Sequence, residues 1–236
     1  MSKYLNKYYW IRKIFVNNFF SKFLSQKALN KIVFNSIYKS NHWNKNQKFD
    51  SNQSYSGPGS AANSIQTNNL IFEFQKFFKE SNIKNILDAP CGDCAWIKKI
   101  FQTDIKYTGI DVVEDLINQN KLTFNSNSNI EFYCKDLTEY NKFDNYDFIL
   151  MRDFFIHLPL PMIKKILINL KNSNCKYFAF NNYERVNLNT EISTGQHRKI
   201  NLLKDPFNLD LPYYKIQEIN NKNKHDQDNF IYIYKK

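Results

Sequence analysis

A short stretch of the chain has the residue types and spacing of a ligand-binding loop. Residues 84–97 read KNILDAPCGDCAWI, so that Asp88, Gly92 and Asp93 follow an apolar run. A glycine lets backbone approach a ligand closely. An acidic residue at the end of the next strand, here Asp111, commonly accepts hydrogen bonds from ribose hydroxyls. Neither G-x-G-x-x-G nor G-x-x-x-x-G-K-[ST] occurs, so a nucleoside-type ligand without phosphates is predicted.

The same stretch holds a C-x-x-C pair, Cys91 and Cys94. A structural zinc needs four ligands, usually two such pairs, whereas Cys134 and Cys175 stand apart on separate predicted strands. A redox pair at the start of the predicted helix over residues 94–101 is the alternative. We predict no metal site and interpret the cysteines as small residues in a tight loop.

A second group of residues that could take part in catalysis comprises Arg152, Asp153 and His157. If the intervening residues are helical, Asp153 and His157 share a face, and the carboxylate would orient an imidazole suited to proton abstraction near neutral pH. Arg152 would bind a carboxylate of the cofactor or of an acidic substrate bidentately. The alternative is that His157 is a packed residue that caps the next helix.

The elements that would position these residues alternate between strand and helix. Strand-like runs cover residues 83–89, 106–113, 129–136, 146–153 and 176–184. Helical segments are predicted at residues 60–79, 94–101, 114–124 and 159–171. Two final strand-like runs follow at residues 213–219 and 229–235. This order predicts an α/β fold, namely a Rossmann-like, doubly wound, seven-stranded and mostly parallel sheet that ends in an antiparallel hairpin. Ligands of such sheets bind at the carboxyl ends of the strands.

Together these motifs resemble class I S-adenosylmethionine (SAM)-dependent methyltransferases over residues 38–236. ILDAPCGD looks like their first motif, YTGIDVV like the ribose-binding strand, YCKDLTE like the adenine-contacting strand and YDFILMRDFFIHL like the strand that leads into the active site. With IYKSNHW, SGPGS and TGQHRKINLLKDPFNLDLP, the chain also resembles a bacterial subfamily of small methyltransferases. Its members are often found among enzymes of polysaccharide and capsule biosynthesis. Cys94 departs from the pattern of that subfamily.

The resemblance implies that the cofactor is SAM and assigns its contacts. Asp88, Pro90 and Gly92 would surround the methionine part, with Asp93 near its amino group and Arg152 at its carboxylate; Asp111 would bind the ribose; Val112, Asp136 and Leu137 would bind the adenine. For Asp88 and Asp136, capping of the following segment is the alternative role.

Substrate contacts are expected from two further places. The long segment 194–212 lacks regular periodicity, which is typical of a functional loop. His197 and Arg198 would contact a phosphate or a sugar nucleotide, and Asn201, Phe207 and Asn208 would shape the acceptor pocket. Ser56, in SGPGS, would close over the cofactor, and Trp43 would stack there. Simple packing of the loop is the alternative.

Charge divides the chain into two predicted parts. Residues 1–48 carry ten Lys or Arg and no acidic residue, whereas the rest carries 23 basic and 22 acidic residues. We predict a basic, amphipathic helical arm over residues 1–48 and a methyltransferase domain over residues 49–236. The apolar face of the arm would pack on the domain, contact a membrane surface through residues 1–24, or bind nucleic acid.

The function expected from these features is methyl transfer to a hydroxyl, or a phosphoramidate oxygen, of a sugar, glycan or nucleotide-linked cell-surface precursor. His157 would be the base and Asp153 its partner. Alternatives are an O- or N-methyltransferase of an unrelated small molecule and a non-catalytic binding subunit. The near-neutral body argues against a nucleic-acid substrate. Cysteine usage and the absence of an 18-residue apolar run predict a cytoplasmic protein, with contact at the inner membrane face as the alternative. The oligomeric state is left open.

Overall fold

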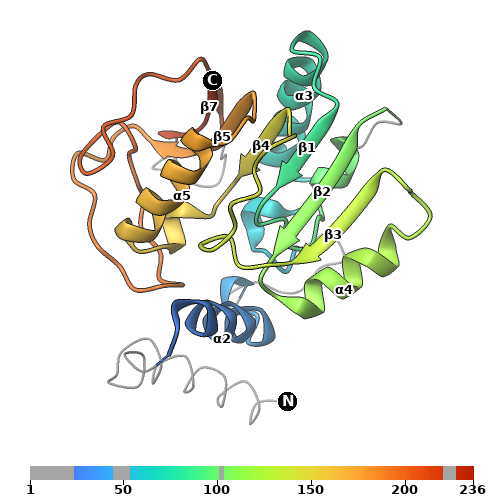
Figure 1. The fold of residues 1–236 in the computed structure, drawn as a ribbon, viewed down its shortest axis with the longest axis horizontal. Coiled ribbons are helices and arrows are strands. Elements are labelled where there is room, and N and C mark those ends of the chain that lie inside the picture. Colours follow the sequence, from blue (N-terminus) through green and yellow to red (C-terminus); the bar gives the residue numbers. More distant parts are fainter. Residues whose placement is uncertain (1–23, 45–53, 101–103, 220–226) are drawn as a thin grey trace.

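The computed structural model describes residues 24–44, 54–100, 104–219 and 227–236. Its centre is a seven-stranded sheet in the order β3-β2-β1-β4-β5-β7-β6 (Figure 1). The first five strands run parallel, and β7 runs antiparallel to both β5 and β6. The predicted fold class, including the antiparallel hairpin at the end, is therefore confirmed.

The strands are β1 (Asn85–Asp88), β2 (Lys106–Asp111), β3 (Ile130–Cys134), β4 (Phe148–Met151), β5 (Tyr177–Tyr183), β6 (Tyr214–Gln217) and β7 (Asn229–Lys235). The α-helices are α2 (Gln26–Lys39), α3 (Ile65–Glu80), α4 (Glu114–Thr123) and α5 (Leu160–Asn172). Short 3₁₀ turns cover His42–Asn44, Pro58–Ser60, Ile97–Ile100 and Phe155–His157. Every residue of β4 is buried, as expected for a central parallel strand covered on both faces.

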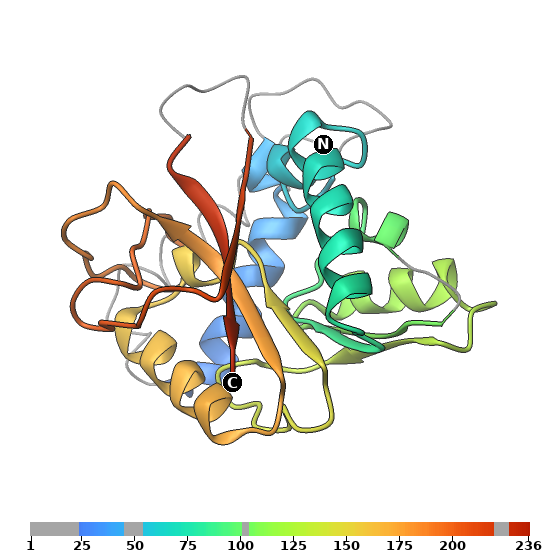
Figure 2. The same ribbon diagram turned by 90° about the horizontal axis from the view of Figure 1, so that it is seen from above.

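Helices cover both faces of the sheet, and α3 and α5 lie on opposite sides of it (Figure 2). On one face, Phe74 and Phe77 of α3 pack against Phe148 of β4, with ring centroids 5.8 Å apart in each pair. On the other face, α5 buries Ile163, Ile166 and Leu170 in a second cluster. The two cores hold the carboxyl ends of the strands in fixed positions.

One predicted helix is absent. The α-helix expected over residues 94–101 is a 3₁₀ turn at Ile97–Ile100, and residues 101–103 lie outside the described part. Cys94 has a positive φ of 52°, a conformation that an α-helix does not contain. Cys94, Trp96 and Ile97 are instead buried against α3. The C-x-x-C pair therefore does not stand at the N-terminus of an α-helix, which was the premise of the redox alternative.

The second half of the predicted arm forms α2, which lies across the carboxyl ends of the parallel strands (Figure 1). Ser25 caps it by accepting a hydrogen bond from the Ala28 amide. Val33 and Ile37 are fully buried in the same cluster as α5. The membrane contact predicted for residues 1–24 of the arm falls almost wholly on residues outside the described part.

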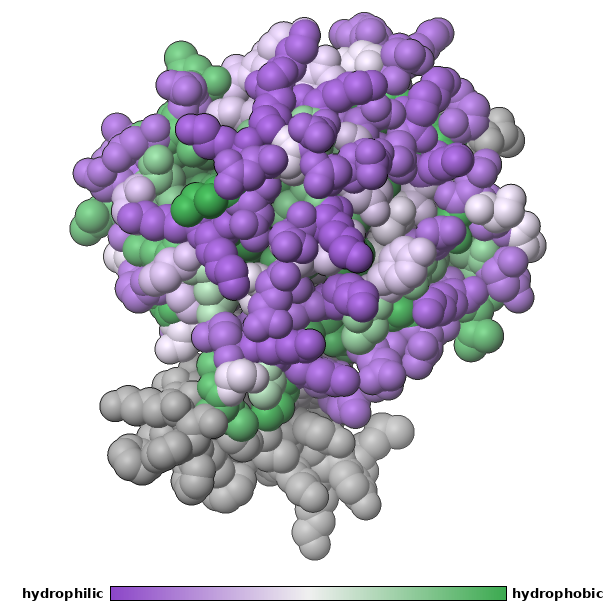
Figure 3. Space-filling view, in the orientation of Figure 1, coloured by the Kyte–Doolittle hydropathy of each residue, from purple (hydrophilic) through white to green (hydrophobic). Residues whose placement is uncertain are grey.

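No helix in the described part of the chain is long and apolar enough to span a membrane. The face shown in Figure 3 is predominantly hydrophilic, with apolar residues in small separate areas.

Candidate functional site

Three adjoining cavities lie near the carboxyl ends of the parallel strands, and residues of α2 line the first two. The first cavity reaches the ends of β2 and β3, the second the loop after β1, and the third the region beside β5, β6 and β7. Trp43, Asp153 and His157 line all three. These three residues therefore mark the point where the cavities meet.

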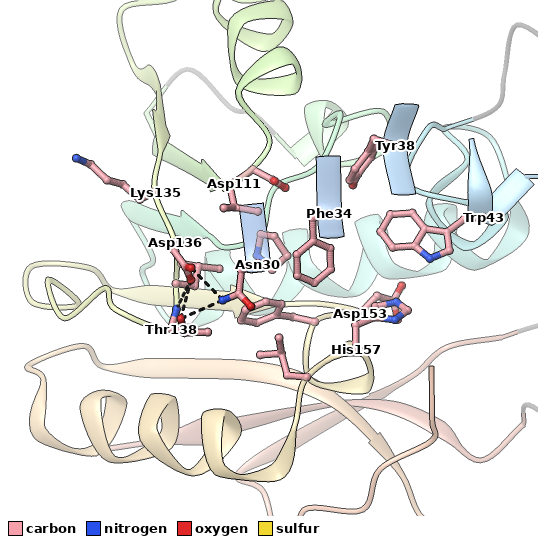
Figure 4. Close-up of a pocket in the computed structure, with 15 residues that line it drawn as sticks. Asn30, Phe34, Tyr38, Trp43, Asp111, Lys135, Asp136, Thr138, Asp153 and His157 are labelled. Atoms are coloured by element: carbon pink, nitrogen blue, oxygen red, sulfur yellow. Dashed lines mark hydrogen bonds between the residues drawn. The ribbon is translucent and has the colours of Figure 1, made fainter. Parts of the chain in front are cut away.

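The first cavity has a polar end and apolar walls (Figure 4). At the polar end, Asp136 Oδ1 accepts hydrogen bonds from the amide and hydroxyl of Thr138, at 2.9 and 2.8 Å. Asp136 Oδ2 accepts from the Asn30 side-chain amide of α2 at 2.9 Å. The apolar walls are Phe34, Val112, Leu137, Phe154 and Leu158. A flat, mostly apolar group with a polar edge would suit this space.

Asp111 ends β2 at the border of this cavity. Its Oδ2 accepts from the Gly92 amide at 3.1 Å and its Oδ1 from the Val113 amide at 2.9 Å. Desolvation by burial raises its pKa from 3.8 to about 6, although these backbone amides act in the opposite direction. The carboxylate is therefore held in one orientation between the β1 loop and α4.

The second cavity is built around Gly92, which has a φ of 55°. A Cβ at this position would lie 2.3 Å from Ser56 Oγ, so only glycine fits. Asp88, at the end of β1, also lines the cavity and accepts a hydrogen bond from the Tyr107 hydroxyl at 2.7 Å. Burial raises the pKa of Asp88 from 3.8 to about 7, against the lowering effects of Tyr107 and Arg152.

The cysteines of this loop serve its packing. Both thiols are buried, and the Asn120 amide of α4 approaches them at 3.9 Å (Cys91 Sγ) and 3.5 Å (Cys94 Sγ) while donating to the Gly92 carbonyl at 2.8 Å. Burial raises the pKa of the Cys91 thiol, which disfavours the reactive thiolate. Among the described residues no cluster has the composition of a metal site.

Asp93 fastens the SGPGS region over the glycine loop. Its carboxylate accepts hydrogen bonds from Ser54 Oγ at 2.8 and 2.9 Å and from the Tyr55 amide at 2.6 Å. Ser56 Oγ in turn lies 3.0 Å from the Tyr38 hydroxyl of α2. Ser56 therefore contacts both the glycine loop and α2, while its closure over the cofactor stays a prediction.

Arg152, after β4, lies between the second and third cavities and is only 6% exposed. Its Nε donates to Glu218 at 2.6 Å, its Nη1 to Ser60 Oγ at 3.0 Å and its Nη2 to the Gly59 carbonyl at 3.0 Å. Nη1 is also 3.1 Å from Asp153 Oδ2. The guanidinium therefore ties β4, β6 and the SGPGS turn together, while its edge remains part of the second cavity.

His157 lies at the junction of the cavities, in the 3₁₀ turn that follows β4. Its Nδ1 is 2.9 Å from the Gln196 carbonyl oxygen. The ring is 5.3 Å from that of Trp43, tilted by 30°, and 5.6 Å from that of His197. Asp153 has a positive φ of 53°, so the two residues are not on one α-helical face as expected, yet both reach the junction.

The third cavity is wide, and its lining combines apolar surface with many hydrogen-bonding side chains. It is lined by side chains of the SGPGS turn and the start of α3, by Tyr183, His197, Glu218 and Asn229, and by the three junction residues. Glu218 is shared with Arg152, and it also accepts from Gln66 at 2.6 Å and Asn229 at 2.7 Å. Hydrogen-bonding groups from four separate segments thus converge on one space.

Three residues expected near the substrate lie elsewhere. The Arg198 guanidinium is buried and donates to the carbonyls of Phe155 and Leu158, at 3.3 and 2.9 Å. The Asn201 side chain donates to the carbonyls of Glu184 and Val186, which follow the end of β5. Phe207 packs on the core. None of the three lines the cavities as described.

The contribution of α2 was missed. Asn30, Phe34 and Tyr38 line the first cavity, but they fall in the segment assigned to a separate arm. Leu29, Val33 and Ile37 recur at helical spacing, a signal that a buried helix follows residue 25.

Comparison with known proteins agrees with this geometry. Residues 86–173 match a family described as a methyltransferase domain. No curated protein matches the sequence.

Several solved structures share the fold. Magnesium protoporphyrin IX methyltransferase (ChlM) from Synechocystis PCC 6803, solved with bound SAM, is similar with a TM-score of 0.60 and 11% identity, over 89% of this chain and 96% of that one. A SAM-dependent methyltransferase from Clostridium acetobutylicum has a TM-score of 0.55 and 14% identity, over 73% and 92%. The N-methyltransferase NodS from Bradyrhizobium japonicum has a TM-score of 0.53 and 11% identity, over 73% and 97%.

The strand order, the site at the carboxyl ends and the match at residues 86–173 identify a class I SAM-dependent methyltransferase. Its cofactor is SAM, and its second substrate is a methyl acceptor.

Proposed function

We propose that the protein transfers the methyl group of SAM to a hydroxyl of a sugar, glycan or nucleotide-linked precursor, with His157 as the base. The observation that carries this proposal is the meeting of the three cavities at Trp43, Asp153 and His157. Two of the cavities suit the two ends of the cofactor. The third, which many hydrogen-bonding side chains line, remains for the acceptor.

The first cavity would hold the adenine. Val112 and Leu137 flank a flat apolar space, together with Phe34 of α2. Asp136 would accept a hydrogen bond from the adenine amino group, since each carboxylate oxygen can accept more than one bond. Asn30 holds Asp136 Oδ2 from the side of α2. Asp111, at the end of β2, would accept from the ribose hydroxyls.

The second cavity would hold the methionine part, which carries an ammonium and a carboxylate. Asp88, Asp93 and Arg152 all line this cavity, so that it presents both carboxylates and a guanidinium. Gly92 and Pro90 would allow close approach of the backbone. This charge pattern is complementary to that of an amino acid zwitterion.

The chemistry required of the protein is positioning and removal of one proton. The sulfonium of SAM supplies an activated methyl group. As the acceptor oxygen forms its bond to the methyl carbon, the carbon–sulfur bond breaks and the hydroxyl proton passes to the His157 ring. Asp153, paired with Arg152, would favour the positive charge that develops on His157.

The third cavity supports a polyhydroxylated acceptor. Its described lining combines amides, carboxylates, imidazoles and a phenol with Trp43, which are groups that hydrogen-bond to and stack on a sugar ring. The resemblance to polysaccharide and capsule enzymes points to the same substrate class, including a phosphoramidate-bearing sugar. His197 would contact this acceptor from the cavity wall.

A methylation screen with radiolabelled SAM tests the proposal. Nucleotide sugars, free glycosides and capsule-type oligosaccharides are compared with amines, DNA and RNA. We expect product only from the carbohydrate group, with the label in an O-methyl ether or a methylated phosphoramidate. Transfer exclusively to amines or nucleic acids would refute it.

A further inference from the structure

Residues 195–198 run beside the turn that carries His157. The Gly195 amide donates to the His157 carbonyl at 2.9 Å, and the Arg198 amide donates to the Ile156 carbonyl at 3.0 Å. We call residues 195–198 the histidine bracket. Its two main-chain bonds hold the backbone of His157 from one side.

The Arg198 side chain strengthens the same attachment. Its Nη1 donates to the carbonyls of Phe155 and Leu158, one on each side of the 156–157 pair. The residue is only 7% exposed, and hydrogen bonds from a buried cation are stronger than neutral ones. Burial lowers the pKa of Arg198 to about 10, so the guanidinium stays protonated at neutral pH.

The bracket also contacts the ring of His157. Nδ1 is 2.9 Å from the Gln196 carbonyl oxygen. A carbonyl oxygen only accepts hydrogen bonds, so Nδ1 must carry the proton. In the neutral ring the acceptor nitrogen is then Nε2.

Gly195 seats the bracket on α2. Its φ is 79°, and a Cβ there would lie 2.4 Å from Val33 Cγ1 and 3.0 Å from Ile37 Cδ1. A side chain at residue 195 would therefore push the bracket away from α2 and move the Gln196 carbonyl with it.

We infer that the histidine bracket is the positioning element of the reaction: the Gln196 carbonyl fixes His157 in the tautomer whose Nε2 is the base, and Gly195 and Arg198 hold that carbonyl in place. The inference rests on the proposed role of His157 in taking the proton. It gives to a main-chain carbonyl the orienting role that the sequence assigned to Asp153. The Asp153 carboxylate instead pairs with Arg152, and its amide donates to Asn181 Oδ1.

The tautomer can be measured directly by ¹⁵N NMR on histidine-labelled protein. The chain has four histidines, and a His157→Gln variant assigns the resonance. The spectrum is recorded near pH 8.5, about two units above the usual imidazole pKa, where the ring is neutral. We expect the Nδ1–H form in the wild-type protein. A wild-type ring in the Nε2–H form would overturn the inference.

Two variants test the bracket itself. Gly195→Ala should mix the two tautomers and lower kcat about 10-fold or more while the KM for SAM changes less than about 2-fold. Arg198→Met should act in the same direction, and Arg198→Lys, which keeps the charge, should recover part of kcat. Ser193→Ala, an exposed position in the same loop, is the matched control and should leave tautomer and kcat unchanged.

Thermal unfolding identifies any variant that has merely lost its fold, and Arg198→Lys keeps the test valid if Gly195→Ala does not fold. Folded bracket variants with an unchanged tautomer and unchanged kcat would refute the inference. The proposed function fails separately: if His157→Gln retains full kcat, His157 is not the base, whatever tautomer the ring adopts.

Discussion

At the scale of single residues, the site depends on a few side chains that are buried or held by a specific hydrogen bond. His157 has its Nδ1 occupied by the Gln196 carbonyl and lies where three cavities meet. Asp88 and Asp111 are carboxylates in buried positions. Each of these features leads to a measurable property.

The His157→Ala variant should lose kcat by about 10² or more, the usual range for a general base. The Kd for SAM should stay within about 2-fold, because the proposed cofactor contacts lie on other residues. Single-turnover kinetics and calorimetric titration with SAM measure the two quantities. A variant that loses SAM affinity and kcat together would show that His157 acts through the cofactor instead.

SAM affinity should rise with pH. Burial raises the pKa of Asp88 to about 7 and that of Asp111 to about 6, so both carboxyls are partly protonated below neutral pH in the absence of ligand. The cationic groups of SAM favour the ionised carboxylate, and binding therefore releases protons. Between pH 6 and 8 the affinity should increase about 10-fold.

Titration calorimetry in buffers of different ionisation enthalpy measures this proton release. Without SAM, the same raised pKa values imply a free energy of unfolding that falls as pH rises from about 4 to 7. In an Asp88→Asn variant the pH dependence of binding should shrink. An affinity that instead increases toward low pH would contradict the assignment.

At the scale of elements, the sequence predicts those helices and strands that show a periodic apolar pattern, and the residues that stand at their ends. The alternation of strands and helices sufficed for the sheet and for the position of carboxylates at strand ends, such as Asp111. It did not suffice for the short 3₁₀ turn at Ile97–Ile100, because the positive φ of Cys94 arises from tertiary packing. The burial of Arg198 could not be predicted for the same reason. Its guanidinium donates to the carbonyls of Phe155 and Leu158, which are distant in sequence, and such a contact leaves no pattern in the neighbouring residues.

The helix α2 provides the clearest element-level prediction. Asn30→Ala removes the amide that holds Asp136 Oδ2, and one such hydrogen bond is worth about 1 kcal/mol. We expect SAM affinity to fall about 5-fold, measured by calorimetry. Asn35→Ala, on the same helix but bonded only to the Lys31 carbonyl at the surface, is the control. Equal losses in both variants would mean that α2 acts through stability alone.

The ion pair between Arg152 and Glu218 connects β4 with the residue after β6. Because both side chains are nearly inaccessible to water, Glu218→Ala removes the buried one of the two charge partners of the guanidinium, leaves only Asp153, and should cost about 3 kcal/mol in the free energy of unfolding. Asp115→Ala breaks the exposed Lys39–Asp115 pair and should cost less than about 1 kcal/mol. Urea denaturation compares the two, and similar losses would contradict this account.

At the scale of the whole molecule, the predicted boundary at residue 48 stays a prediction, but α2 packs into the main core. A chain that starts at residue 24 should therefore keep its SAM affinity, whereas one that starts at residue 45 should lose it together with Asn30, Phe34 and Tyr38. Calorimetry measures both. Flotation of the full and shortened chains with anionic vesicles would then assign membrane contact, or its absence, to residues 1–23.

The order of strands also bears on how the protein is made. Residues 229–235 leave the ribosome after the other described strands, yet β7 lies between β5 and β6, and in the described sheet β6 pairs with β7 alone. Until then Glu218 has no Asn229 beside it, and the third cavity lacks a wall. On the proposed function, a nascent chain paused before residue 229 would have the cofactor half of its site but no complete place for an acceptor. Methyl transfer would then begin only after β7 has been inserted.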